Sequence, residues 1–164
     1  MVRTALLACL VFASSLAMGA VRELSWEELI PPGAAPAPEP IPLHDLSQGL
    51  SESGPAAMQA EPDAPVNEQL NGQAIKLPGY IVPLEISDEG YVTDFLLVPY
   101  YGACIHVPPP PSNQIVYVTS AKGVRLDELY QPFWIEGPLD VEKSASELAT
   151  AGYRMAAQQI YPYE

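Results

Sequence analysis

Apolar and polar residues alternate in five stretches from residue 73 onward, and a period of two is typical of β-strands. The stretches are residues 73–87, 91–99, 114–119, 132–142 and 153–161. The first stretch carries a kink at Pro78 and Gly79, and the turn at residues 88–90 joins it to the second stretch as a hairpin. Residues 124–130 predict a short helical turn, and residues 144–150 predict a short helix before the last strand.

Five bent strands in a short span, with glycine kinks and one inserted helix, favour a small closed barrel. The strand count and spacing fit a five-stranded OB-like barrel over residues 70–164. A small open antiparallel sandwich is the alternative. The predicted fold class is therefore mainly β.

The preceding part of the chain has a different pattern. Residues 24–32 predict one short helix, with Ser25 as its cap, Glu28 completing a capping box and Pro31 ending it. Residues 33–65 are rich in proline, alanine and acidic residues and hold few apolar anchors. Residues 20–69 are thus predicted to be a short helix followed by an irregular acidic arm.

Residues 1–19 have the pattern of an export signal. Arg3 supplies a positive charge, residues 5–17 are almost entirely apolar, and small residues allow cleavage after Gly19. The apolar run is shorter than the roughly 18 residues that a membrane-spanning helix needs, although an uncleaved anchor is the alternative. We therefore expect a periplasmic protein that is not inserted in the membrane after cleavage.

The net charge of the protein excludes two classes of binding partner. Cleavage after Gly19 leaves six basic and 20 acidic residues and a charge near −14. Nucleic acid and anionic membrane surfaces both repel such a protein, so neither is an expected partner. Cleavage also leaves Cys104 as the single cysteine, which excludes a disulfide within the chain.

The candidate chemistry lies in residues 98–116. Cys104 and His106 stand two residues apart, and in an extended strand both side chains project from one face. The four prolines that follow favour a stiff, exposed polyproline II rod. The rod and its neighbours form a predicted protein-binding surface, and its members are Tyr100, Tyr101, Pro108, Pro109, Pro110, Pro111, Asn113 and Gln114.

Three interpretations of Cys104 and His106 remain open. The two side chains and a carboxylate, with Asp94 preferred over Glu85 and Glu164, are ligands suited to a labile Zn²⁺ site. Alternatively, Cys104 is the nucleophile of a thiol-dependent enzyme and His106 its base. In the third interpretation Cys104 is a buried core residue and His106 braces the proline loop.

The chain resembles a family of uncharacterised exported bacterial proteins of unknown function. The resemblance rests on the string Gly-Ala-Cys-Ile-His-Val-Pro-Pro-Pro-Pro-Ser-Asn-Gln at residues 102–114, with support from residues 26–31, 70–73, 79–85 and 133–137. It implies a periplasmic partner of an ABC-type export or lipoprotein-sorting permease, with a link to zinc supply in some members. It implies no catalytic activity.

Overall fold

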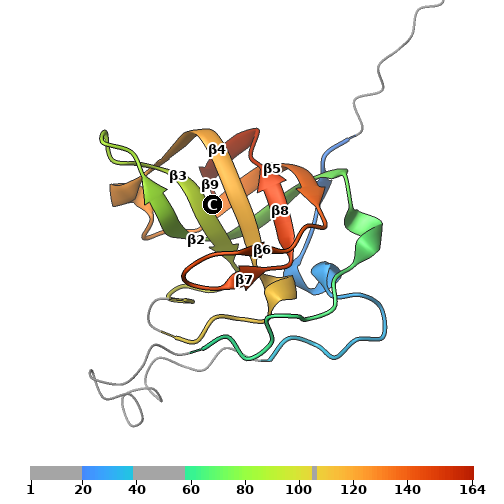
Figure 1. The fold of residues 1–164 in the computed structure, drawn as a ribbon. Helices are drawn as coiled ribbons and strands as arrows, with labels where there is room; N and C mark the ends of the chain where they lie inside the picture. The colour runs from blue at the N-terminus through green and yellow to red at the C-terminus, as the bar shows by residue number, and fades with distance from the viewer. Residues whose placement is uncertain (1–19, 39–57, 105–106) are drawn as a thin grey trace, which may run out of the picture.

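The computed structural model describes residues 20–38, 58–104 and 107–164. In chain order the elements are β1 (Arg22–Glu23), η1 (Trp26–Leu29), η2 (Glu68–Leu70), β2 (Gln73–Ile86), β3 (Tyr91–Val98), η3 (Ser112–Gln114), β4 (Val116–Arg125), η4 (Leu126–Glu128), β5 (Phe133–Asp140), β6 (Ser144–Ala145), β7 (Thr150–Ala151), β8 (Tyr153–Ala156) and β9 (Gln159–Pro162). The η elements are short 3₁₀ helices. The prediction of a mainly β chain is confirmed (Figure 1). The predicted signal peptide at residues 1–19 lies outside the described residues.

Seven of the strands form one sheet in the order β1-β2-β3-β4-β8-β5-β9, in which β2 also pairs with β5, and β6 and β7 form a separate two-stranded sheet. The pairings therefore run in a closed ring from β2 through β3, β4, β8 and β5 back to β2. Neighbours in the ring are antiparallel except β4 and β8, which are parallel. Five strands were predicted, and the count is wrong for the sheet as a whole because β1 and β9 extend it beyond the ring.

The long strand β2 belongs to two parts of the ring. Its first half, up to Gly79, pairs with β5, and its second half, from Tyr80, pairs with β3. The change of partner falls at the predicted kink. A Cβ atom on Gly79 would stand 2.7 Å from the carbonyl oxygen of Val98, so the close approach of β2 and β3 requires a residue without a side chain.

Two predicted elements are wrong. Residues 144–150 form no helix; the hydroxyl of Ser146 instead accepts the backbone N–H of Ala149 at 3.1 Å in a turn between β6 and β7. The closing strand predicted at residues 153–161 is two strands. Between them, the backbone N–H of Ala157 donates to Thr119 of β4, and the backbone N–H of Gln158 donates to Glu136 of β5. The pairing of β8 with β4 ends at this point, and the pairing of β9 with β5 begins.

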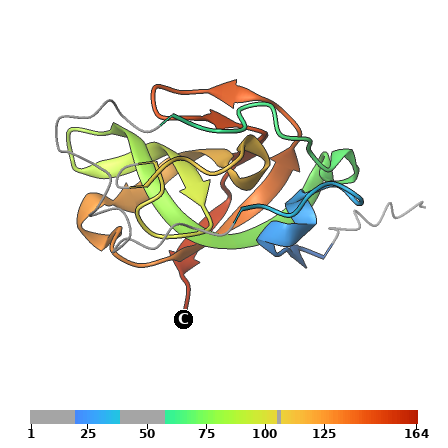
Figure 2. The same ribbon diagram turned by 90° about the horizontal axis from the view of Figure 1, so that it is seen from below.

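The core fills the ring and also lies outside it. Phe95 and Leu97 of β3 face the ring interior, whereas Leu96 and Val98 face a second cluster under the loop between β3 and β4. All four are fully buried, which explains the unbroken apolar run at this point of the sequence. Residues 58–69 run beside the hairpin of β6 and β7 (Figure 2). Leu24 and Leu29 of the N-terminal segment pack into the ring core, so residues 20–38 and 70–164 share one core.

Within the described residues, no helix is long and apolar enough to cross a bilayer.

Candidate binding site

The loop between β3 and β4 lines a cavity that contains several of the predicted binding residues. The cavity has a volume of about 620 Å³. Its apolar lining comes from the loop, from η1 and from both described ends of the N-terminal arm, and consists of Trp26, Ala37, Pro38, Met58, Ala60, Pro99, Tyr100, Val107, Pro108, Pro109, Pro110 and Pro111. All four prolines of the predicted binding surface line this cavity. We call this space the proline-lined cavity.

The prolines are less exposed than predicted. Pro109 and Pro110 are buried, and Pro108 and Pro111 are only half-buried. The side-chain amide of Gln59 donates to the carbonyl oxygen of Pro110 at 2.8 Å, which ties the loop to residues 58–69. The prediction of a freely exposed rod is therefore wrong, because the N-terminal arm packs along it.

Three consecutive polar residues, Ser112, Asn113 and Gln114, are buried beside the prolines. The hydroxyl of Ser112 accepts the N–H of Ala64 at 3.0 Å, and the amide of Asn113 donates to Pro65 at 2.8 Å. These bonds hold the arm in place. Asn113 does not line the cavity, so its predicted binding role has no surface in the described structure.

Gln114 connects the loop to η1. Its amide donates to the carbonyl oxygen of Trp26 at 2.9 Å, and the indole N–H of Trp26 donates to Pro78 of β2 at 2.7 Å. Trp26 is therefore held from both sides. Because Gln114 also lines the proline-lined cavity, it fixes one wall and contributes to the surface.

The charged groups of the cavity are both acidic. Glu27 and Glu61 line it, and no lysine or arginine of the described residues does. Hydrogen bonds from the backbone N–H of Glu27 and from the Ser25 hydroxyl lower the pKa of the Glu27 carboxyl, so this group is ionised at neutral pH. The cavity therefore combines apolar walls with negative charge.

Cys104 does not have the extended conformation that the motif predicts. Its φ is +66°, in the left-handed region that residues other than glycine seldom adopt. The chain turns here, and the N–H of Val107 bonds to the carbonyl oxygen of Gly102 at 3.2 Å. The geometry that would place two side chains on one face of a strand is absent at Cys104. His106 lies outside the described residues.

The environment of Cys104 keeps its thiol protonated. The side chain packs with Tyr100 and Tyr117 against the second core cluster. Burial raises the pKa of the Cys104 thiol to about 12. A thiol of this kind is a weak nucleophile and a weak metal ligand at neutral pH, because both roles need the thiolate.

Asp94, the preferred carboxylate of the predicted metal site, lies on β3. It accepts a hydrogen bond from the Tyr117 hydroxyl at 3.3 Å, and its charge helps burial to raise the pKa of Tyr117. Among the described residues no three histidine, cysteine, aspartate or glutamate side chains gather closely enough to hold a metal ion. The Zn²⁺ site at Cys104, His106 and Asp94 stays a prediction.

Tyr100, Tyr101 and Trp134 lie in three different parts of the structure. Tyr100 lines the proline-lined cavity, and burial and the nearby Cys104 raise its pKa. Tyr101 lines a second cleft. Trp134 lines neither; it lies on β5, where the Lys76 ammonium stands 4.4 Å from its ring centroid and the Tyr163 ring packs at 5.1 Å.

The sequence did not predict the part of the cavity wall that comes from Trp26, Glu27, Met58 and Glu61. The acidic composition of the arm was a signal for Glu61 alone. No local pattern indicated that residues 26 and 58 would meet the proline loop, because these contacts join segments 50 or more residues apart.

Comparison with known proteins gives two findings. The family model described as "Protein of unknown function (DUF3299)" matches residues 26–162. The crystal structure of a DUF3299 family protein from Pseudomonas aeruginosa PAO1 is similar over 89% of this chain and 98% of that one, with 69% sequence identity and a TM-score of 0.81. No curated protein matches the chain.

Proposed function

Since the chain belongs to the DUF3299 family of proteins of unknown function, we propose from its own geometry that it is an exported, non-enzymatic binding protein of the periplasm. Its partner is a membrane transporter component of the ABC-permease type, and a segment of that partner occupies the proline-lined cavity. We also infer that the closed ring of five strands is an OB-like barrel, on which the loop between β3 and β4 forms the binding site. The order of the ring strands and the parallel pairing of β4 with β8 support this inference.

The observation that carries the proposal is the cavity itself. Its volume of about 620 Å³ lies in the range of roughly 300–1,000 Å³ that is typical of ligand pockets. Prolines and aromatic rings form rigid walls, so a partner binds them without ordering many side chains. The bonds from Gln59 and Gln114 hold the walls in position before binding.

The negative charge of the cavity indicates what charge the partner segment carries. In the part of the chain that the structure describes, Glu27 and Glu61 are the charged lining residues, and no basic residue lines the cavity beside them. A segment that inserts an apolar side chain and carries a lysine or arginine beside it satisfies both features. The protein's overall charge of −13 favours the same kind of segment.

The test uses Met58, whose side chain is 87% exposed at the mouth of the cavity. We expect Met58→Glu to weaken binding to a purified permease component at least about tenfold, because a third carboxylate repels a basic segment and an apolar contact is lost. Met58→Leu is the matched control and should retain affinity. Equal affinity of the two variants, both with unchanged melting temperature, would rule out this cavity as the site.

The zinc link and the thiol-enzyme alternative remain predictions. The protonated thiol of Cys104 supports neither. A third, structural interpretation has more support, since the Cys104 side chain packs against a core cluster.

A further inference from the structure

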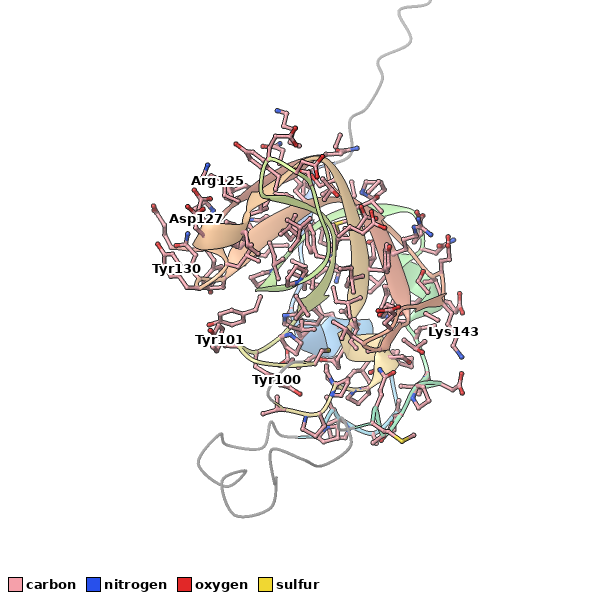
Figure 3. All side chains as sticks on the ribbon, turned by 60° about the vertical axis from the view of Figure 1, so that its left-hand side comes forward. Tyr100, Tyr101, Arg125, Asp127, Tyr130 and Lys143 are labelled. Carbon is pink, nitrogen blue, oxygen red and sulfur yellow. The ribbon has the colours of Figure 1, made fainter. Side chains whose placement is uncertain are left out.

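A second cleft opens near the end of β3, between the loop that follows β3 and the segment that follows η4. Its volume is about 320 Å³. Three tyrosines line it: Tyr80 from β2, Tyr101 from the first loop and Tyr130 from the second segment. Figure 3 shows Tyr101 and Tyr130 on the same side of the molecule, with Asp127 and Arg125 beyond Tyr130. We call this space the tyrosine cleft.

Its aromatic rings are unusually accessible. Tyr130 is 73% exposed and Tyr101 is 55% exposed, whereas the cleft floor is formed by the buried Ile81 and Val82 of β2. The rings of Tyr80 and Tyr101 have centroids 5.7 Å apart and planes inclined by 71°. The Tyr80 and Tyr101 rings therefore pack edge to face against each other, and Tyr130 adds a third ring to the lining of the cleft from another segment.

The charges around the tyrosine cleft are mainly negative. The backbone N–H of Leu126 bonds to Gly90 at 3.1 Å and so places η4 beside the turn at residues 88–90. The two segments joined by this bond carry the carboxylates of Asp88, Glu89, Asp127 and Glu128, of which Asp127 lines the cleft.

Arg125 does not make the cleft basic. Its guanidinium donates to both carboxylate oxygens of Asp127, at 3.0 and 2.8 Å, and it is not among the lining residues. Asp127 is the charged residue of the lining. The aromatic faces and the Asp127 carboxylate of the lining therefore favour a cationic ligand over an anionic one.

We propose that the tyrosine cleft binds a small solute that carries a quaternary ammonium group, of the choline or betaine class. Such a cation is attracted to the negative faces of aromatic rings, and its methyl groups also pack on an apolar floor. A primary ammonium is more strongly hydrated and loses more on entering the cleft. The site is separate from the proline-lined cavity and goes beyond the proposed function.

The experiment measures choline binding to the full-length protein by NMR titration or calorimetry. We expect saturable binding with a dissociation constant of roughly millimolar order, given the size of the ligand. The neutral isostere 3,3-dimethylbutan-1-ol, which has the same shape without the charge, should bind at least about fivefold more weakly. Equal binding of the two molecules, or no saturable binding of choline, would overturn the proposal.

Variants identify the site. Tyr101→Leu and Tyr130→Leu should each weaken choline binding about fivefold or more, whereas Tyr101→Phe keeps the ring and should retain it. Both tyrosines are exposed, so the fold tolerates the changes, which unchanged melting temperatures will verify. Tyr163→Leu is the control at an exposed tyrosine outside the cleft. Loss of binding in Tyr163→Leu, or retention in both cleft variants, contradicts the assignment.

A further arm separates a free solute from a lipid headgroup. Binding to phosphatidylcholine vesicles without binding to free choline would overturn the choice of a small solute. Met58→Glu, which alters the proline-lined cavity, should bind choline as the unmodified protein does. Loss of choline binding in Met58→Glu would place the binding site in the proline-lined cavity and overturn the proposal.

Discussion

The hydroxyl of Tyr153 donates a hydrogen bond of 2.5 Å to the carbonyl oxygen of Leu29, which lies 124 residues earlier in the chain. The same hydroxyl accepts the backbone N–H of Asn67 at 2.6 Å. Tyr153 is fully buried on β8, so one side chain joins the ring of strands to η1 and to the segment before η2. These are the segments that carry one wall of the proline-lined cavity.

We expect Tyr153→Phe to lower the free energy of unfolding by about 1–3 kcal/mol, because it leaves a buried carbonyl and a backbone N–H without their partner. Denaturant unfolding monitored by fluorescence measures the change. Tyr163→Phe, at a tyrosine that is 47% exposed, is the control and should stay within about 0.5 kcal/mol. Equal stabilities of the two variants would show that the hydroxyl of Tyr153 does not join the segments.

Replacement of Pro109 and Pro110 by alanine should destabilise the protein by about 1–3 kcal/mol, because both are buried and alanine adds freedom to the unfolded chain. Thermal melting measures the effect. Pro62→Ala, at an exposed turn in the arm, is the matched control and should cost less. An unchanged melting temperature in the double variant would show that the loop is not packed as described.

Cys104 should react slowly with alkylating reagents. Because the pKa of its thiol is about 12 in the folded protein, we expect iodoacetamide at pH 8 to modify it at least about tenfold more slowly than in urea-unfolded protein. The rate in the folded protein should still be rising above pH 9. A plateau near pH 9 would indicate an exposed, ordinary thiol.

The same thiol links stability to pH. Burial raises the pKa of the Cys104 thiol from its unfolded value of 9.0 to about 12. The contribution of the thiol to the free energy of unfolding is therefore fully present below pH 9 and is lost as the pH rises from 9 toward 12, because the unfolded chain releases the proton first. Tyr153, whose pKa burial raises to about 12, acts in the same direction. Cys104→Ala should flatten the fall in melting temperature over this window. An identical pH profile would show that Cys104 does not contribute.

Zn²⁺ binding can be decided by calorimetry. If Cys104 is a ligand, binding must remove its proton, so affinity should be weak at pH 7 and increase with pH. Cys104→Ser and His106→Ala should then each abolish most of the heat. Tight, pH-independent binding that survives Cys104→Ser would place a zinc site elsewhere in the protein.

The sequence predicted the positions of the ring strands because alternation is a local property, although β4 continues to Arg125, beyond the predicted end at residue 119. The hairpin of β2 and β3 and the change of partner at Gly79 follow from turn residues and a glycine. The capping interaction at η1 was also predicted, and the Ser25 N–H donates to the Glu28 carboxylate at 2.9 Å. Such features depend on residues only a few positions apart.

The hairpin of β6 and β7 could not be predicted in this way. Residues 144–150 have a helical capping pattern, yet the backbone N–H of Thr150 donates to the Gln59 side chain at 2.9 Å, and Ala149 and Ala151 are buried in the second core cluster. Contacts with a segment about 90 residues earlier decide the structure there. A seven-residue helix has too little stability of its own to resist them.

The sequence by itself determined the strand alternation and the concentration of unusual residues at 98–116. Only the tertiary structure decided that Tyr100 and Tyr101 separate: Tyr100 lines the proline-lined cavity with Trp26 and Met58, and Tyr101 lines the tyrosine cleft with Tyr130. The physical reason is that a local pattern fixes the direction of a side chain, whereas a cavity requires walls from segments that only the packed core brings together.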